Sequence, residues 1–305
     1  MDRNRILSKK IKQAKLERNA VILAHLYQSP EVQDVADFVG DSLDLSRHAR
    51  DTKADVIVFA GVSFMAETAK ILNPTKTVLL PDPTAGCPMA NMVKVEEVMA
   101  LKTAHPDAAV VCYVNSSIEV KAVSDICCTS ANAVRVVRSL PQKKIIFVPD
   151  KNLGQYTARH CPDKEFFYAK GYCPTHDSLG LQQVIQAKER HPGAPVLTHP
   201  ECKPEIWDVS DFIGSTSQML EFARKSRAKQ FIICTEMGIL HQLSSYNLDK
   251  EFFSPSPNMI CPQMKRTSLV SIEASLEKNR FMIEVEKGIM QQATRSLERM
   301  LELPV

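Results

Sequence analysis

The chain has 305 residues, of which 24% are charged and 44% hydrophobic, and a formal net charge of +3. This length allows two or three domains, because a single core stops growing at about 250–300 residues. The small net charge argues against nucleic-acid binding, and no stretch approaches the ~20 apolar residues that cross a bilayer. The basic N-terminal segment also lacks the apolar core of a signal peptide. We therefore expect a cytoplasmic protein that binds neither nucleic acid nor membranes.

Apolar, strand-like segments recur along the chain in three copies of about 86 residues each. Every copy has four such segments, and many are rich in the Val, Ile and Phe that favour strands. In chain order they are 21–27, 38–44, 55–61 and 75–81, then 110–115, 126–132, 144–150 and 163–169, and finally 195–201, 212–218, 230–236 and 249–255. The fourth segments of the second and third copies both begin with DKEFF.

Segments with helical periodicity separate the strand-like ones, for example at 46–53 and 215–226. Alternating strands and helices favour parallel sheets with helices on their faces, and near-continuous apolar strands fit burial on both faces. We predict an α/β fold of three homologous, small parallel-sheet αβα domains in a pseudo-three-fold arrangement around a central active site. The predicted boundaries are 1–88, 89–174 and 175–262, with 263–305 forming one or two amphipathic helices that pack back onto the first domain.

A cysteine followed by proline stands after the fourth strand-like segment of every copy. These are Cys87, Cys173 and Cys261, at intervals of 86 and 88. A residue before proline stays out of helical geometry, so each thiol should stand on a stiff loop and, if the copies face one axis, converge with the others. Three thiolates can hold a four-iron cluster whose fourth iron is open to substrate. A zinc site with His176 as a further ligand, or three ordinary loop cysteines, are the alternatives.

Polar residues repeat at the same spacing just past the strand-like segments, where parallel sheets bind their ligands. The aligned sets are His25, Tyr113 and His199; Tyr27, Asn115 and Glu201; and Ser42, Ser130 and Thr216. The histidines, the tyrosines and Glu201 predict acid–base groups. The hydroxyls predict either ordinary helix N-caps or, taken together, a site for a small and multiply anionic substrate.

The chain resembles the quinolinate synthase family in segments that follow one another in the same order over nearly its whole length. They are AHLYQSPEVQDVADFVGDSLDLS, CYVNSS, VPDKNLGQY, HPEC, IGSTSQML and CPQMKRTSL. The resemblance implies three homologous α/β domains around a [4Fe-4S] cluster. It also implies the second step of NAD synthesis from aspartate, in which iminoaspartate condenses with dihydroxyacetone phosphate to give quinolinate, phosphate and water. Functional coupling to L-aspartate oxidase follows from the same resemblance.

The resemblance also implies roles for individual residues. Cys87, Cys173 and Cys261 would ligate the cluster. Catalytic roles would fall to Tyr27, Tyr113, His199 and Glu201, with Tyr27 and Glu201 as proton-transfer groups. Substrate contacts are implied for His25, Ser42, Tyr113, Asn115, Ser130, His176, His199, Glu201, Ser215 and Thr216. Lys151 and Lys265 receive no role.

Two other functions remain open at this point. An aconitase-like hydro-lyase would use the same three-thiolate cluster on a hydroxyacid. An iron–sulfur redox sensor would need an exposed cluster and no paired acid–base residues, so the repeated His, Tyr and Glu set argues against it. Quinolinate formation, tested against dehydration of citrate or tartrate, separates the two enzymes.

Overall fold

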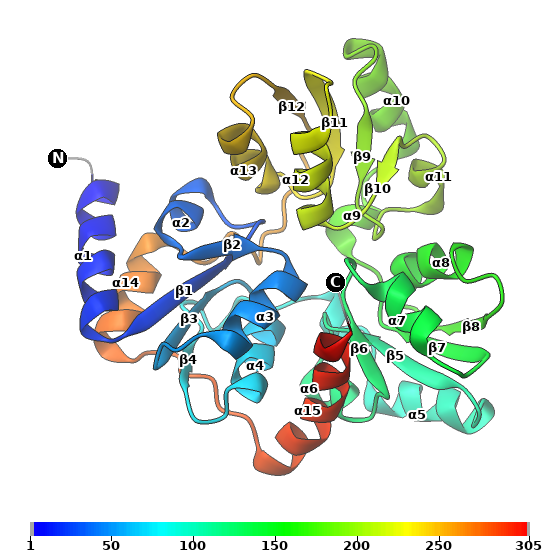
Figure 1. The fold of residues 1–305 in the computed structure, drawn as a ribbon, viewed down its shortest axis with the longest axis horizontal. Coiled ribbons are helices and arrows are strands. Elements are labelled where there is room, and N and C mark those ends of the chain that lie inside the picture. Colours follow the sequence, from blue (N-terminus) through cyan, green and yellow to red (C-terminus); the bar gives the residue numbers. More distant parts are fainter. Residues whose placement is uncertain (1–2, 304–305) are drawn as a thin grey trace.

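The computed structural model describes residues 3–303, which form three separate four-stranded parallel sheets. The sheets have the same strand order, in which the first strand of each copy lies between its second and third strands and the fourth strand forms the edge. Figure 1 shows the three resulting units arranged around a common centre, as the sequence predicted. The α/β class and the three small layered units are therefore confirmed.

The first unit contains β1 to β4 and the helices between them. Its strands are β1 (Ala20–His25), β2 (Phe38–Gly40), β3 (Val56–Ala60) and β4 (Thr77–Leu79), and its helices are α1 (Arg3–Glu17), α2 (Pro30–Val35), α3 (Ser42–Asp51) and α4 (Ser63–Leu72). All of β3 is buried, because helices cover both faces of the sheet. This burial explains why its sequence, VIVFA, is apolar throughout rather than alternating.

The second and third units repeat this plan. The second has β5 (Ala109–Tyr113), β6 (Ile126–Cys128), β7 (Lys144–Val148) and β8 (Glu165–Tyr168), with η1 (Met89–Asn91), α5 (Val95–Ala104), α6 (Ile118–Ala122), α7 (Ala133–Ser139) and α8 (Lys151–Arg159). The third has β9 (Val196–Thr198), β10 (Phe212–Ile213), β11 (Gln230–Cys234) and β12 (Glu251–Phe253), with α9 (Pro174–Asp177), α10 (Leu181–Arg190), α11 (Pro204–Trp207), α12 (Thr216–Lys225) and α13 (Ile239–Tyr246).

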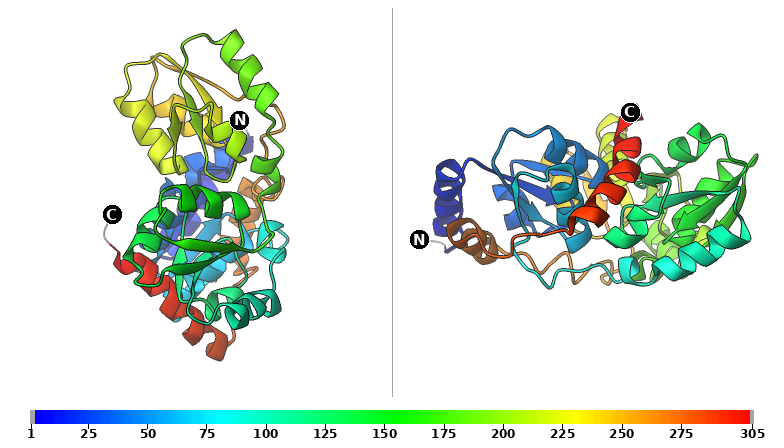
Figure 2. Two further views of the ribbon diagram at one scale, coloured as in Figure 1. Left: turned by 90° about the vertical axis from the view of Figure 1, so that its right-hand side faces the viewer. Right: turned by 90° about the horizontal axis from the view of Figure 1, so that it is seen from below.

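The C-terminal segment forms two helices that pack against different parts of the molecule. Helix α14 (Leu269–Lys278) packs against α1 and β3 of the first unit, whereas α15 (Lys287–Glu302) lies against α4 of the first unit and α6 and β6 of the second. Figure 2 shows α15, in red, beside both units. Both helices thus contact the first unit, and α15 contacts the second unit in addition, which the sequence did not predict. The reason is that the first and second units share one continuous hydrophobic core, which the apolar face of α15 completes.

We expect Leu297→Ala to lower the free energy of unfolding by about 2–5 kcal/mol, because the truncation leaves a cavity in the core that joins the two units. Leu297 is fully buried there. Urea unfolding followed by circular dichroism measures the effect. The matched control is Leu248→Ala, since Leu248 is 93% exposed. Equal unfolding midpoints for the two variants would show that α15 does not join the units.

Among the described residues, no helix combines the length and the apolarity that a bilayer span requires.

Candidate active site

The repeated polar residues meet at the centre of the molecule, at the carboxyl ends of the sheets. His25 ends β1, Tyr113 ends β5, and His199 directly follows β9. A small cavity of about 30 Å³ is lined by His25, Tyr27, Asp41, Ser42, Phe64, Tyr113, Asn115, Ser130, His199, Glu201, Thr216 and Met264. All nine residues of the three repeated sets thus face one cavity, because equivalent strands deliver them from three directions.

The three cysteines lie together in a second cavity of about 250 Å³ that adjoins the first. It is lined by one Cys-Pro pair from each copy, and also by Tyr27, Asn115, His176, Glu201, Glu236 and other residues. Tyr27, Asn115 and Glu201 line both cavities. A thiol-rich donor set of this kind suits iron–sulfur clusters and zinc. The acid–base residues therefore stand directly beside the three thiols.

The proline after each cysteine begins a turn that points backbone N–H groups at the sulfur. Cys173 is the N-cap of α9 and Pro174 its first residue, a position where the missing N–H of proline costs nothing. N–H groups two or three residues further on interact electrostatically with each sulfur, namely those of Met89 and Ala90, of His176, and of Gln263 and Met264. Such donors favour a negatively charged sulfur.

Burial works against that charge while the thiols are free. It raises the pKa of Cys87 to about 12, the pKa of Cys173 well above its usual value, and the pKa of Cys261 as well. A bound metal would supply the missing positive charge, since a coordinated thiol is deprotonated outright. The convergent thiols and their N–H donors therefore fit a metal cluster held by one cysteine from each unit.

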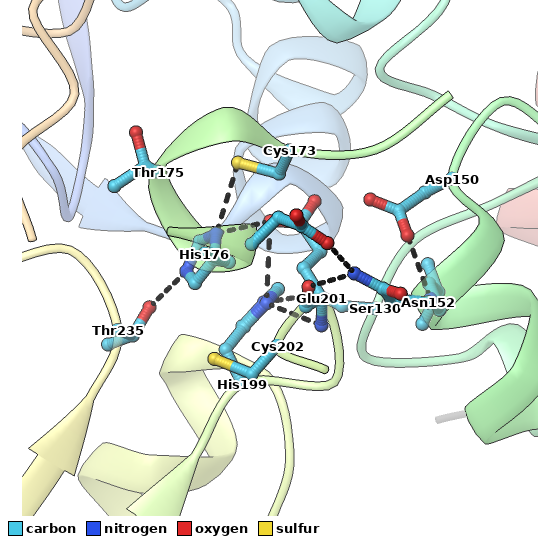
Figure 3. Close-up of polar contacts among 12 residues, drawn as sticks. Ser130, Asp150, Asn152, Cys173, Thr175, His176, His199, Glu201, Cys202 and Thr235 are labelled. Atoms are coloured by element: carbon cyan, nitrogen blue, oxygen red, sulfur yellow. Dashed lines mark hydrogen bonds and ion pairs between the residues drawn. The ribbon is translucent and has the colours of Figure 1, made fainter. Parts of the chain in front are cut away.

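His176 connects the thiol of Cys173 to Glu201, as Figure 3 shows. Its Nδ1 atom lies 2.7 Å from Oε2 of Glu201 and 3.1 Å from Sγ of Cys173. Its Nε2 atom lies 2.8 Å from Oγ1 of Thr235, which in turn lies 2.7 Å from the hydroxyl of Tyr27. The ligand atoms of Cys173, His176 and Glu201 all lie within 4.8 Å of one another, so this group could also hold a single metal ion.

The carboxyl group of Glu201 is the charge centre of the site. Burial opposes its ionisation, but His176, 2.7 Å away, outweighs that effect and lowers the pKa of Glu201 to about 2. Its Oε1 atom is buried and has no hydrogen-bond partner within residues 3–303. A buried acceptor without a partner is costly, so Oε1 indicates a place for a ligand donor.

The other acid–base groups are held in their neutral forms. Burial lowers the pKa of His25 and of His199 to about 3. Burial and the charge of Glu201 raise the pKa of Tyr27 and of Tyr113 well above the usual value. At neutral pH the cavity therefore offers two neutral imidazoles and two tyrosine hydroxyl donors around one carboxylate.

Ser42 and Thr216 are the first helical residues of α3 and α12, and the N-caps are the residues before them, Asp41 and Ser215. The N-cap interpretation of these two hydroxyls is therefore wrong by one residue, because the preceding side chain accepts the free N–H groups. Their hydroxyls instead face the 30 Å³ cavity, as does Ser130, which lies 3.2 Å from Nε2 of His199. Ser215 donates to Asp41 Oδ2 at 2.9 Å, joining the first and third units, and lines a neighbouring open cavity of about 620 Å³.

Asp41, Phe64, Met264 and Thr235 are among the site residues that lay outside the sequence prediction. Thr235 bridges Tyr27 and His176, and Phe64 and Met264 form apolar walls. The repeat could not reveal Thr235, because Pro149 occupies the equivalent position of the second copy. The unassigned lysines form ion pairs, Lys151 with Asp177 at 3.9 Å and Lys265 with Glu236 at 2.8 Å.

Together, the fold and the cavities define a class: a three-unit α/β enzyme whose active site lies on the axis between the units and combines three thiols with acid–base groups. Comparison with known proteins agrees. The sequence profile described as "Quinolinate synthetase A protein" matches residues 9–302.

Curated relatives carry the name quinolinate synthase. The chain is 49% identical over 297 residues to the quinolinate synthase of Caldicellulosiruptor saccharolyticus, covering 97% of this chain and 98% of the relative. It is 53% identical over 298 residues to that of Geobacter metallireducens, covering 98% of each, and 54% identical over 288 residues to that of Geotalea uraniireducens, covering 94% of each. The chain therefore belongs to the quinolinate synthase family, and so to NAD biosynthesis.

Proposed function

We propose that this chain condenses iminoaspartate with dihydroxyacetone phosphate to give quinolinate, phosphate and water, with a [4Fe-4S] cluster as cofactor. The observation that carries the proposal is the pair of adjoining cavities, one lined by three thiols and the other by the acid–base residues. The shared family membership supports the same reaction. The proposed reaction joins two substrates and releases phosphate and water. We therefore class it as a transferase-type condensation with dehydration.

Cys87, Cys173 and Cys261 would hold the cluster, one from each unit. When bound, the cluster supplies a Lewis acid through the iron that has no protein ligand. His176 and Glu201 stand beside Cys173. They would orient a substrate group at the wall shared by the two cavities.

Substrate binding would use the hydroxyls that face the smaller cavity. Ser42 and Thr216 stand in the first turns of α3 and α12, where the hydroxyls can donate to a phosphate or carboxylate and the helix dipole favours such an anion. This contact surface would be completed by Ser130, Ser215, His25 and Asn115. Among the described residues, Oδ1 of Asn115 has no hydrogen-bond partner. Holding two substrates in one orientation lowers the entropic barrier to joining them.

Proton transfer would centre on Glu201, with His199 and Tyr113 positioned against it. A chain of contacts runs from the Tyr27 hydroxyl through Thr235 and His176 to Glu201, with steps of 2.7, 2.8 and 2.7 Å. Glu201 would take a proton from the substrate, and Tyr27 would return one at the opposite wall. These two groups suit the isomerisation and dehydration steps of the proposed reaction.

Iminoaspartate must be produced by an oxidation of aspartate, and we propose functional coupling to L-aspartate oxidase in the cytoplasm. The substrates are small molecules, and neither a nucleic acid nor a membrane has a part in the proposal.

The test is anaerobic purification, iron and sulfide analysis, and an assay with iminoaspartate and dihydroxyacetone phosphate. We expect about four irons and four sulfides per chain, and quinolinate that appears only when both substrates are present. Citrate and tartrate serve as alternative substrates in parallel. Dehydration of either hydroxyacid without quinolinate formation would identify a hydro-lyase instead, and a metal-free chain that forms quinolinate would remove the cluster from the proposal.

A further inference from the structure

The second residue after the third strand of each unit differs in a way that the reaction chemistry does not explain. Val62, Asp150 and Glu236 occupy equivalent positions, at intervals of 88 and 86. All three side chains are buried, and both carboxylates are fully inaccessible to solvent. Burying a carboxylate costs free energy unless it is paired and hydrogen-bonded. Val62 occupies the same position in the first unit, which folds in the same way. The fold of a unit therefore does not require a carboxylate there.

Glu236 binds the backbone of the third cysteine loop. Its Oε1 atom accepts the N–H of Cys261 at 3.1 Å and lies 2.8 Å from Nζ of Lys265. Its Oε2 atom accepts the N–H of Gly238 at 2.7 Å. Lys265 also donates to the backbone carbonyl of Tyr27. One partly buried ion pair therefore joins a cysteine loop to the strand end that carries an acid–base residue.

The backbone at Gly238 packs closely against both Tyr27 and Glu236. A Cβ atom on Gly238 would lie 2.7 Å from the backbone of Tyr27 and 2.8 Å from Oε2 of Glu236. Glycine is needed here for this close approach. The carboxylate, the Cys261 loop and the Tyr27 strand end are therefore held together as one rigid group.

Asp150 has the equivalent position beside the second cysteine loop. One oxygen caps α8 by accepting the N–H of Leu153 at 2.8 Å. The N–H of Cys173 favours the ionised form of the same carboxyl group electrostatically, and the N–H of Lys151 donates to the carbonyl of Gly171, two residues before Cys173, at 2.8 Å. The contact of Asp150 with this loop is looser than that of Glu236, because Oδ2 of Asp150 makes no hydrogen bond of normal geometry in the part of the chain that the structure describes.

The first cysteine loop is held in another way. The N–H of Gly86, next to Cys87, donates to Oε1 of Gln263 at 3.2 Å. Gln263 stands two residues after Cys261, so the third cysteine loop supplies the acceptor for the first. Val62 has no polar side-chain atom that could do so. Each cysteine loop thus has a polar side chain beside its backbone. Gln263 and Glu236 accept hydrogen bonds from the N–H groups of Gly86 and Cys261, whereas Asp150 interacts electrostatically with the N–H of Cys173.

We propose that Glu236, with its partner Lys265, and Asp150 are positioning residues that fix the backbone of Cys261 and Cys173 and so aim their thiols at the shared cavity. The inference rests on the cluster-binding role proposed above for these thiols. It assigns functions to Glu236 and Asp150 and to the otherwise unassigned Lys265. It also explains why two of three equivalent positions bear the cost of a buried carboxylate.

The test measures each thiol separately in the metal-free protein, so it does not depend on cluster loading or turnover. Alkylation by iodoacetamide, followed over time by peptide mass spectrometry, gives a rate for Cys87, Cys173 and Cys261. Glu236→Gln keeps the volume but leaves one acceptor oxygen for three donors. We expect it to change the rate at Cys261 about tenfold, the size expected for one lost charge-assisted hydrogen bond, with Cys87 and Cys173 unchanged.

Two further variants make the test specific. Asp150→Asn keeps an oxygen to cap α8 but replaces Oδ2 by a donor, and should change the rate at Cys173 alone and by less. Gln263→Ala should change the rate at Cys87 alone. The control is Asp249→Ala, whose exposed ion pair with Lys229 lies in the third unit away from the loops. Thermal unfolding of every variant separates a local effect from general loosening.

Equal changes at all three thiols, or none at Cys261 in Glu236→Gln, would overturn the inference. If Glu236→Gln does not fold, Lys265→Met takes its place, with the same thiol-specific result expected. In the iron-loaded protein, a chelator should remove iron faster from Glu236→Gln than from Asp249→Ala. A wild-type chain that binds no iron would refute the proposed cofactor, while the thiol-specific rates would still decide the positioning roles.

Discussion

Cys261→Ser will yield a folded protein that lacks the visible absorbance of an iron–sulfur cluster and forms no quinolinate. Serine fills nearly the same volume, and Cys261 is only partly buried, so stability should change little. Its hydroxyl does not replace a thiolate as an iron ligand. We expect turnover to fall by ~10³ or more, because a bound Lewis acid stabilises the transition state by several kcal/mol. Iron analysis, absorbance spectra and the quinolinate assay measure the three effects.

The chain offers a matched control for this substitution. Cys161→Ser removes a buried thiol of the second unit that lines neither of the two central cavities. It should retain iron, absorbance and turnover. Cys87→Ser and Cys173→Ser should behave like Cys261→Ser. If any of these three retains a full complement of iron and its activity, the proposal that each unit contributes one ligand fails for that unit.

Glu201→Gln will keep the cluster absorbance and lose about 10²–10⁴ in turnover, the usual contribution of a positioned general base. Glutamine has nearly the same shape as glutamate, so its side chain can take the same position beside His176 and His199. The variant should therefore still fold. It cannot take up a proton, and it interrupts the path from Tyr27 through Thr235 and His176. Steady-state kinetics should show the loss in kcat, with binding of dihydroxyacetone phosphate largely retained.

Glu205→Gln is the control for this experiment, because Glu205 is a partly exposed carboxylate of the same unit that lines none of the central cavities. Its turnover should equal that of the wild type. Unchanged turnover in Glu201→Gln would remove Glu201 from the proton-transfer role. Loss of absorbance together with turnover would instead assign Glu201 to cofactor binding beside Cys173.

Much of the site could be found from the sequence because the repeat places equivalent residues at equivalent strand ends. His25, Tyr113 and His199 share the interval of the strands that carry them, and parallel sheets present such positions at one edge. Thr235 broke the pattern, since its equivalent in the second copy is Pro149. The capping residues were misplaced by one position at Ser42 and Thr216, because the choice of cap depends on which side chain reaches the free N–H groups.

The amino-acid sequence by itself determined the α/β class, the three units and the family, because strand and helix patterns are local and the repeat multiplies their signal. Tertiary structure alone decided which distant residues touch. The contacts of Tyr27 with Thr235, of Lys265 with Glu236 and of α15 with both α4 and α6 depend on how three units close around one axis. That closure depends on how the surfaces of whole units pack against one another. No short sequence pattern indicates such packing.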